Sequence, residues 1–342
     1  MSKDEEFHNR QEKLTRQIFQ SEDMLPSRYV YVLTNACNLK CDFCFQDKRP
    51  KAKNMKAPDW NALTDQLPEY ARVTFTGGEP LLFKQFKDVF EHVATKHDCN
   101  IITNGMLLTE ELIDFMLQYE HFKVLAVSID NINNTVRGLE IDEWQHAENM
   151  MRYFIKRRNE LNHSAIMEAK TVVLDHTADQ LLAIHKYCIE DLSCDHHSYQ
   201  MLKGSHLQHS DMMFPMGDVF KTSTAPVYNN LDIIKDQFEQ IRSYNVSHHK
   251  KAFLHPIVGN LNDEQPLPDL DYINQVGFEP EKFKPCMFPW SSVHINYDGH
   301  LFPCMSVSMG NSRHQSLVEI MQGEPYKEFK AHLKEQGLVE GC

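Results

Sequence analysis

The sequence predicts an α/β fold in which a parallel β-sheet closes, wholly or partly, into a barrel. Between about residues 29 and 202, β-rich apolar runs alternate five or six times with segments of helix length. This alternation favours a parallel sheet with right-handed crossovers. A chain of 342 residues with 42% hydrophobic content can bury the core that such a fold needs.

Each predicted element follows from a local pattern. The apolar runs predict strands over 28–34, 72–76, 99–103, 124–129, 169–174 and 198–203. Helices are expected over 59–67, 83–96, 109–119, 143–161 and 178–191. The third helix opens with Thr109, an N-cap residue, followed by two glutamates that suit the helix dipole. We therefore expect a barrel core over 28–204 after an amino-terminal extension over 1–27.

The pattern changes after residue 204. The region 205–280 is expected to be a connector of helix and loop, with one amphipathic helix over 231–244. The sequence "VHINYDGHLFPC" (293–304) predicts a hairpin around an Asp-Gly turn, and helices are expected over 316–321 and 326–336. We place a boundary near 280 and expect a small α+β domain, a hairpin plus helices, over 281–342.

Charge and composition exclude several classes of protein. Lys and Arg number 35 against 48 Asp and Glu, a net charge of −13, so a nucleic-acid partner has little electrostatic support. No apolar run is long enough for a membrane span, and the amino terminus is charged where a signal peptide is apolar. We expect a cytoplasmic protein with no membrane partner. In that reducing compartment, clustered cysteines indicate metal binding.

Three cysteines follow the first predicted strand directly. Cys37, Cys41 and Cys44 have the spacing C-x3-C-x2-C, and thiolates select zinc or iron-sulfur clusters. Structural zinc usually takes four ligands, and no fourth ligand is near. A cubane cluster held by three cysteines leaves one iron open for a ligand. We favour the cluster and keep structural zinc as the alternative.

Polar residues follow the next three strands as well. In "FTGGEPLL" (75–82), two glycines permit close approach of the backbone to a ligand, Glu79 offers an acceptor, and Pro80 delays the helix. Alone, this motif fits a plain tight turn equally well. The third and fourth strand ends add Thr103, Asn104, Ser128 and Asp130. Since active sites of such barrels lie at the carboxyl ends of the strands, these residues predict one functional rim.

The cysteine loop, with Phe43 before its last cysteine and GGEP downstream, resembles the radical S-adenosylmethionine (SAM) superfamily over residues 28–204. The resemblance implies a partial (β/α)6 TIM-type barrel. It also implies that Cys37, Cys41 and Cys44 hold a 4Fe–4S cluster whose open iron binds SAM. The implied SAM-binding residues are Phe43, Gly77, Gly78, Glu79, Pro80, Thr103, Asn104, Ser128 and Asp130.

The carboxyl-terminal segment resembles the SPASM and Twitch extensions of this superfamily. Cys286, Gly299 and Cys304 match a cysteine followed by G-x4-C, and Cys342 ends the segment. The resemblance implies an auxiliary iron-sulfur cluster on Cys286, Cys304 and Cys342. The family has a further cysteine just beyond the last position, so an open iron, a non-cysteine ligand or a truncated sequence is expected. A zinc-stapled hairpin is the alternative.

The resemblance also implies a reaction. Such enzymes take an electron from a donor such as flavodoxin or ferredoxin, cleave SAM to a 5′-deoxyadenosyl radical and abstract a hydrogen atom from a substrate. The substrate is expected to be a peptide or another natural product, or alternatively a sugar or aminocyclitol that is dehydrogenated or epimerised. An iron-sulfur electron carrier or zinc-stapled scaffold is the non-enzymatic alternative, against which GGEP and the polar strand ends argue.

Three further residues are weaker candidates for the chemistry. Cys188 and Cys194 could donate a hydrogen atom to the substrate, although buried thiols are the more common case. Arg137 could meet the SAM carboxylate as a bidentate donor, and a surface ion pair is the alternative. Cys99 begins a strand and is expected in the core.

Overall fold

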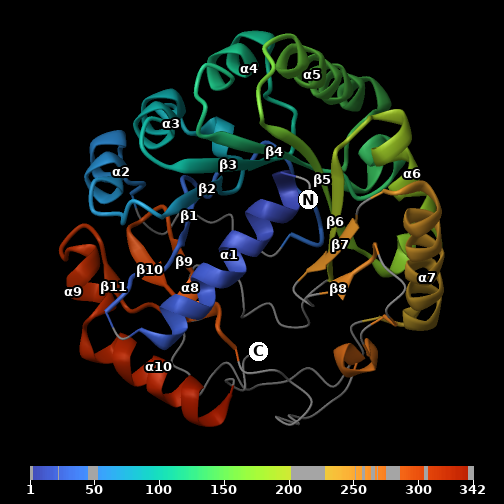
Figure 1. Cartoon of the computed structure of the whole chain (residues 1–342). Coiled ribbons are helices and arrows are strands. Elements are labelled where there is room, and N and C mark those ends of the chain that lie inside the picture. The colour runs from blue at the N-terminus through green and yellow to red at the C-terminus, as the bar shows by residue number, and fades with distance from the viewer. Residues whose placement is uncertain are drawn as a thin grey trace.

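One curved sheet of eleven strands organises the chain (Figure 1), in the order β11-β10-β9-β1-β2-β3-β4-β5-β6-β7-β8. The structure is a computed structural model that describes residues 3–21, 23–44, 53–201, 228–250, 252–255, 259–262, 266–267, 269–274, 286–303 and 307–337. The six predicted strands are present in the predicted order, and each pairs in parallel with the next. They are β1 (Arg28–Val32), β2 (Arg72–Thr76), β3 (Asp98–Thr103), β4 (Phe122–Ser128), β5 (Ile166–Val173) and β6 (His196–Met201).

The sheet extends further than the sequence predicts. β7 (Ala252–His255) pairs in parallel with β6, and β8 (Gly259–Asn260) pairs antiparallel with β7. Both strands lie in the region expected to be a connector of helix and loop, so that expectation was incomplete. Strands of four and two residues are too short for hydrophobic alternation to reveal.

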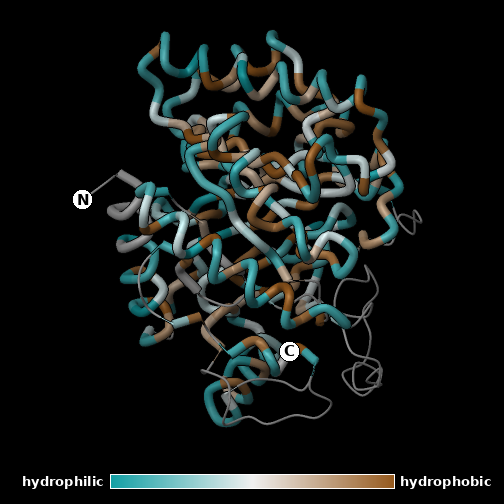
Figure 2. Tube along the Cα trace, turned by 90° about the vertical axis from the view of Figure 1, so that its right-hand side faces the viewer, coloured by the Kyte–Doolittle hydropathy of each residue, from teal (hydrophilic) through white to brown (hydrophobic). Residues whose placement is uncertain are grey.

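Helices cover the convex side of the sheet in Figure 1. They are α2 (Ala57–Thr64), α3 (Phe86–Ala94), α4 (Glu110–Met116), α5 (Ile141–Glu160), α6 (Leu181–Lys186) and α7 (Leu231–His248), with shorter turns at Pro80–Leu82, Ile132–Arg137, Asp175–Gln180, Tyr187–Asp191 and Asp271–Asn274. Figure 2 shows teal, hydrophilic turns on the outside of these helices and brown, hydrophobic segments beneath them. No helix in the described ranges combines the length and apolar content that crossing a bilayer requires.

Alternating side chains give the two faces of the sheet different characters. On β5, Met167 and Ala169 are fully buried in the core against the helices, whereas Glu168 and Lys170 are only partly buried. Since successive side chains of a strand point to opposite faces, Glu168 and Lys170 lie on the inner, concave face. The helices therefore cover the apolar face, and the concave face is free to carry polar chemistry.

The amino-terminal extension forms α1 (Lys3–Gln20), which crosses the opening of the barrel in Figure 1. Arg10 Nη2 lies 3.2 Å from Asp98 Oδ2 at the start of β3, and Ile18 is buried. The Phe19 ring lies 4.8 Å from the Trp290 ring. These contacts put α1 against the amino-terminal ends of the strands, so the carboxyl ends face the other opening.

The predicted carboxyl-terminal hairpin is present and joins the barrel sheet. β9 (Ser292–Ile295) pairs antiparallel with β10 (His300–Phe302) and in parallel with β1. The other elements of this part are α8 (Phe288–Ser291), β11 (Gly310–Asn311), α9 (Leu317–Met321) and α10 (Glu324–Gln336). The two helices predicted after the hairpin correspond to α9 and α10.

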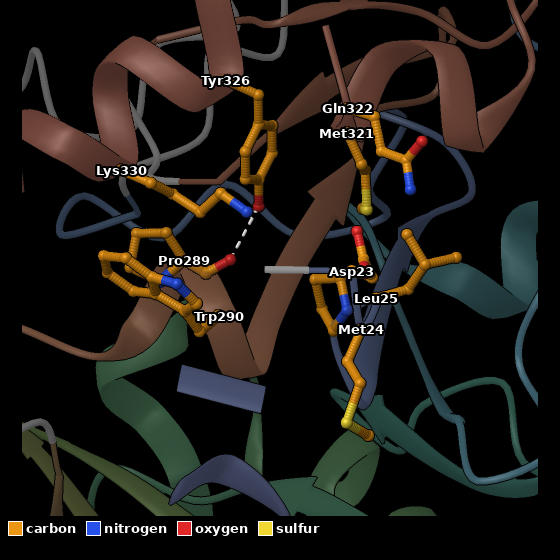
Figure 3. Close-up of a pocket in the computed structure, with 10 residues that line it drawn as sticks. Asp23, Met24, Leu25, Pro289, Trp290, Met321, Gln322, Tyr326 and Lys330 are labelled. Atoms are coloured by element: carbon orange, nitrogen blue, oxygen red, sulfur yellow. Dashed lines mark hydrogen bonds between the residues drawn. The ribbon is translucent and has the colours of Figure 1, made fainter. Parts of the chain in front are cut away.

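A tightly packed seam joins the carboxyl-terminal elements α8 and α10 to the segment between α1 and β1 (Figure 3). The Tyr326 hydroxyl donates to the Pro289 carbonyl at 2.7 Å, with Asp23, Met24 and Leu25 across the gap. The cavity left between them has a volume of about 10 Å³, which is room for one water molecule. We therefore regard the seam as packing and not as a ligand site.

Candidate functional site

The loop after β1 carries the three predicted cluster ligands. Cys37, Cys41 and Cys44 are not joined in disulfides, and all three are partly exposed. The Leu39 N–H donates to Cys37 Sγ at 3.4 Å, and the Cys44 N–H closes a turn by donating to the Cys41 carbonyl at 3.2 Å. The loop therefore presents its thiols at the carboxyl end of the barrel, where the sequence predicts the rim.

The glycines of the GGEP motif pack against this loop. The Gly78 N–H donates to the Thr34 carbonyl at 2.7 Å, and the Glu79 N–H donates to the Ala36 carbonyl at 2.8 Å. A Cβ on Gly77 would lie 2.5 Å from the Thr34 oxygen, and one on Gly78 would lie 2.2 Å from the Ala36 oxygen. From the sequence, both glycines were expected to approach a ligand. In the described structure, the close approach is to the backbone of the cysteine loop.

Gly78→Ala is expected to destabilise the protein by about 3 kcal/mol, because the added Cβ overlaps a backbone oxygen that cannot rotate away. Gly138→Ala is the matched control, because its Cβ would meet nothing within 4 Å. The positive φ of 77° is the remaining source of strain, and it should lower the stability by about 1 kcal/mol. Urea unfolding compares the two variants. Equal losses of stability would contradict the close approach.

Glu79 is buried beneath the rim and holds the next strand end in place. Its carboxylate accepts the Thr103 hydroxyl at 2.7 Å, the Asn104 N–H at 2.8 Å and the Leu81 N–H at 3.1 Å. A carboxylate has about four acceptor positions, so these bonds leave room for one more donor. Burial raises the pKa of Glu79 to about 6, although the hydrogen bonds and Arg137 oppose the shift.

This raised pKa predicts a pH dependence of stability. The folded state keeps the Glu79 proton up to about pH 6, whereas the unfolded chain loses it near pH 4.5. The contribution to stability is therefore fully present below pH 4.5 and is lost as the pH rises to 6, by about 2 kcal/mol. Urea unfolding across this range measures it. Glu79→Gln should remove this fall, and an identical pH profile in that variant would contradict the prediction.

Asp130 and Arg137 form a pair beside the cysteine loop. Asp130 Oδ2 lies 2.6 Å from Arg137 Nε, and Oδ1 accepts the Val172 N–H at 2.7 Å. Asp130 is fully buried, and only 13% of the Arg137 side chain is exposed. The alternative of a surface ion pair for Arg137 is therefore wrong. Asp130, predicted to face SAM, is in contact with Arg137 and the β5 backbone.

Arg137 also contacts the cysteine loop. Its guanidinium lies 5.5 Å from the centre of the Phe43 ring, and its carbonyl accepts the Cys41 thiol at 3.9 Å. A guanidinium over an aromatic ring is attractive. The fourth strand end thus holds a cation next to the predicted cluster ligands.

Two asparagines that were not predicted from the sequence complete the rim. Asn38 Oδ1 accepts from Asn104 Nδ2 at 2.8 Å, which joins the cysteine loop to the third strand end. The buried Asn134 donates to the Ser128 carbonyl and accepts the Asp130 N–H, with a positive φ of 53°. The available signal was the sequence "NINN" directly after a strand, because asparagine tolerates the left-handed conformation.

Cys188 and Cys194 lie in the hydrophobic core on the helix side of the sheet, together with Cys99. Burial raises the pKa of all three thiols. A thiol on the outer face cannot reach a substrate at the rim. The buried positions of Cys188 and Cys194 agree with the more common case of a core thiol, and the expectation of a core position for Cys99 is confirmed.

The predicted auxiliary site is described only at Cys286, because Cys304 and Cys342 lie outside the described residues. Cys286 is partly buried, and its N–H donates to the Gly337 carbonyl at 2.7 Å. Gly337 directly follows α10, so that helix returns the chain to Cys286. The three-cysteine ligand set itself stays a prediction.

The donor chemistry at the rim fits an iron-sulfur cluster with SAM. Three thiols share one loop, a buried carboxylate has one acceptor position left for an ammonium group, and a guanidinium is held nearby. Among the residues that the structure describes, no three Cys, His, Asp or Glu side chains converge on a single metal ion.

Two protein families match this chain. Residues 31–166 match the radical SAM superfamily, and residues 286–342 match SPASM, an iron-sulfur cluster-binding domain. The first match spans β1 to the start of β5 and includes the cysteine loop, GGEP and the rim. The second match begins at Cys286 and ends at Cys342.

Curated relatives and solved structures are also similar. Sporulation killing factor maturation protein SkfB of Bacillus subtilis is 27% identical over 168 residues, which cover 48% of this chain and 40% of SkfB. The subtilosin biosynthesis protein AlbA of the same organism is 26% identical over 33% of this chain and 26% of AlbA. The crystal structure of Streptococcus suis SuiB bound to precursor peptide SuiA has a TM-score of 0.65 at 16% identity, covering 94% of this chain and 69% of SuiB. The chain therefore matches less than half the length of these two curated relatives, and the likeness to SuiB supports the fold.

Proposed function

Because this chain belongs to the radical SAM superfamily and carries a SPASM domain, we propose that it is an enzyme that cleaves SAM reductively and modifies a peptide. The names of SkfB and AlbA describe maturation of a killing factor and biosynthesis of a bacteriocin, and SuiB was crystallised with a precursor peptide. These relatives favour a peptide over the sugar or aminocyclitol alternative. They also favour an enzyme over an electron carrier.

The observation that carries the proposal is the rim, where four strand ends bring complementary groups together. Cys37, Cys41 and Cys44 would hold the 4Fe–4S cluster, and Glu79 would accept the ammonium group of SAM at its remaining position. Arg137, held by Asp130, would pair with the SAM carboxylate as a charge-assisted donor. When bound at these residues, the reduced cluster and SAM would supply the radical chemistry for hydrogen-atom abstraction.

The protein would exclude water and would orient SAM and the substrate relative to one another. α1 lies against the amino-terminal ends of the strands, so we propose that substrate enters at the rim. The SPASM domain would hold an auxiliary iron-sulfur cluster on Cys286, Cys304 and Cys342, and such a cluster would supply redox chemistry beside the substrate. Flavodoxin or ferredoxin would serve as the external electron donor.

Anaerobic reconstitution tests the proposal. Purified protein is loaded with iron and sulfide, mixed with SAM and dithionite, and analysed for 5′-deoxyadenosine and methionine by chromatography. We expect both products in equal amounts, and none without reductant. A reconstituted cluster without SAM cleavage would favour the electron carrier. The same assay with flavodoxin in place of dithionite tests the electron donor.

A further inference from the structure

A second polar cluster lies on the concave face of the sheet, and the rim described above does not use it. It consists of Glu168 and Lys170 on β5 and Ser198 on β6. Lys170 Nζ lies 2.8 Å from Glu168 Oε1 and 3.2 Å from Ser198 Oγ, and Ser198 also donates to Glu168. We refer to these three residues as the inner cluster.

The register of the sheet puts the inner cluster next to the SAM rim. Lys170 is the partner of Ser128, the last residue of β4, and also of Ser198. Ser128 lies two residues before Asp130, which holds Arg137. The inner cluster therefore lies on the neighbouring strands at the level of the predicted cofactor site, on the face where a substrate would lie.

Lys170 has capacity for a further ligand. An ammonium group has three N–H donors, and Glu168 and Ser198 account for two of them. The Lys170 side chain is 34% exposed, whereas that of Glu168 is 17% exposed. The partners thus orient Lys170 without covering it.

On the described strands β1, β2 and β5, the concave face carries more cations than carboxylates. Arg28 and Arg72 are paired neighbours on β1 and β2 and lie on the same face as Lys170, and Arg28 interacts electrostatically with Glu168. On these strands, three cations meet one carboxylate, although the chain as a whole carries −13. At the edge of this face, Asp98 is already paired with Arg10 and His121. An excess of positive charge within an acidic protein favours an anionic ligand.

A purely structural role explains the inner cluster less well. A partly buried ion pair adds little stability over apolar residues of similar size, because desolvation offsets the attraction. The faces of β5 and β6 that pack on helices are indeed apolar or fully hydrogen-bonded. Charged residues on the concave face are better explained by a partner that is itself charged.

We propose that Lys170, oriented by Glu168 and Ser198, binds a carboxylate of the peptide substrate and so selects peptides with an acidic residue near the reacting carbon. This inference rests on the proposed function. Lys170 is assigned as a specificity-determining residue and not as a SAM ligand.

The test compares two pools of capped synthetic peptides of equal length. Each peptide of the first pool contains a glutamate, and its counterpart in the second pool has a glutamine at that position and is otherwise identical. The readout is 5′-deoxyadenosine formed above the rate with SAM and dithionite alone. Wild-type protein should respond to the glutamate pool and not to the glutamine pool. Lys170→Met should raise the peptide concentration for half-maximal response about 10- to 100-fold, since a charge-assisted bond is lost.

Three further variants separate specificity from structure. Lys170→Arg should recover most of the response, and Glu168→Gln should lower the half-maximal concentration, because Lys170 then has no competing carboxylate. Lys186→Met is the matched control, since Lys186 lies 5.1 Å from the Tyr244 ring on the outer side. It should behave as wild type. A merely structural cluster would lower the melting temperature in the Lys170 and Glu168 variants without changing the preference for glutamate.

The outcomes are distinguishable. In the absence of peptide, an unchanged rate of SAM cleavage in Lys170→Met supports the assignment. A tenfold lower rate would make Lys170 a SAM ligand and overturn it. An equal response of wild type to both pools, or a response to neither while SAM is cleaved, would also overturn it. Failure of wild type to cleave SAM at all would instead count against the proposed function.

Discussion

Replacing Cys37, Cys41 and Cys44 together by alanine is expected to abolish reductive cleavage of SAM. The three thiols belong to the loop after β1, and the rim offers no substitute thiolates among the described residues, because Cys99, Cys188 and Cys194 lie in the core. Without its thiolates, the loop has no soft ligands for iron. The measurement is 5′-deoxyadenosine per chain in the anaerobic assay. A triple variant that works at the wild-type rate would show that the cluster is elsewhere.

Iron analysis of the same variant also tests the auxiliary site. About four irons per chain should remain, because a second cluster would keep its own ligands. One zinc in their place would support a stapled hairpin, and no metal would contradict both assignments. Cys99→Ala is the matched control: it removes one buried thiol from β3, and full iron content with undiminished SAM cleavage is expected.

Asp130→Ala is expected to destabilise the protein by about 3–5 kcal/mol, at least as much as the Gly78→Ala substitution. The change leaves the Arg137 guanidinium buried without its carboxylate partner, and it removes the acceptor for the Val172 N–H. A buried charge that has lost its partner destabilises a protein more than the replacement of both charges by apolar residues. Urea unfolding of the cluster-free protein under reducing conditions measures the loss.

A double-mutant cycle isolates the ion pair from the other roles of Asp130. Asp130→Ala combined with Arg137→Met should be more stable than Asp130→Ala alone, because no buried charge is left. Asp130→Asn keeps an acceptor for Val172 and should lie between the two. Additive losses in the double variant would mean that Asp130 and Arg137 act independently, against the 2.6 Å approach of their charged atoms.

The barrel and most of its rim were predictable because they depend on short-range patterns. β1 and β2 each have buried middle residues followed by a turn rich in polar or small residues. β2 ends at the predicted residue, and β1 ends two residues earlier than predicted. A parallel sheet then brings the strand ends to one edge whatever the details of packing. The cysteine loop, Glu79, Thr103 and Asn104 meet for this reason.

What sequence reasoning missed depends on contacts between distant segments. α1 is charged along most of its length, and its role follows from contacts with Asp98 and Trp290 that no local pattern reveals. The pairing of Asp130 with Arg137 requires a loop that reverses direction through the left-handed Asn133 and Asn134. The two glycines of GGEP were assigned to a ligand because their backbone neighbours, about 42 residues earlier in the chain, are known only from the structure.

The parallel pairing of β9 with β1 has a consequence for how the molecule unfolds. β1 is hydrogen-bonded to β2 on one side and to β9 on the other, so the hairpin of the carboxyl-terminal part completes the sheet that the amino-terminal part begins. The two parts should lose structure together, and amide hydrogens of β1 should exchange as slowly as those of β3. Cutting the chain near residue 280 would uncover the β9 side of β1, and an uncovered strand edge is a template for aggregation. We therefore expect the motifs on the two sides of the boundary near residue 280 to unfold as one cooperative unit.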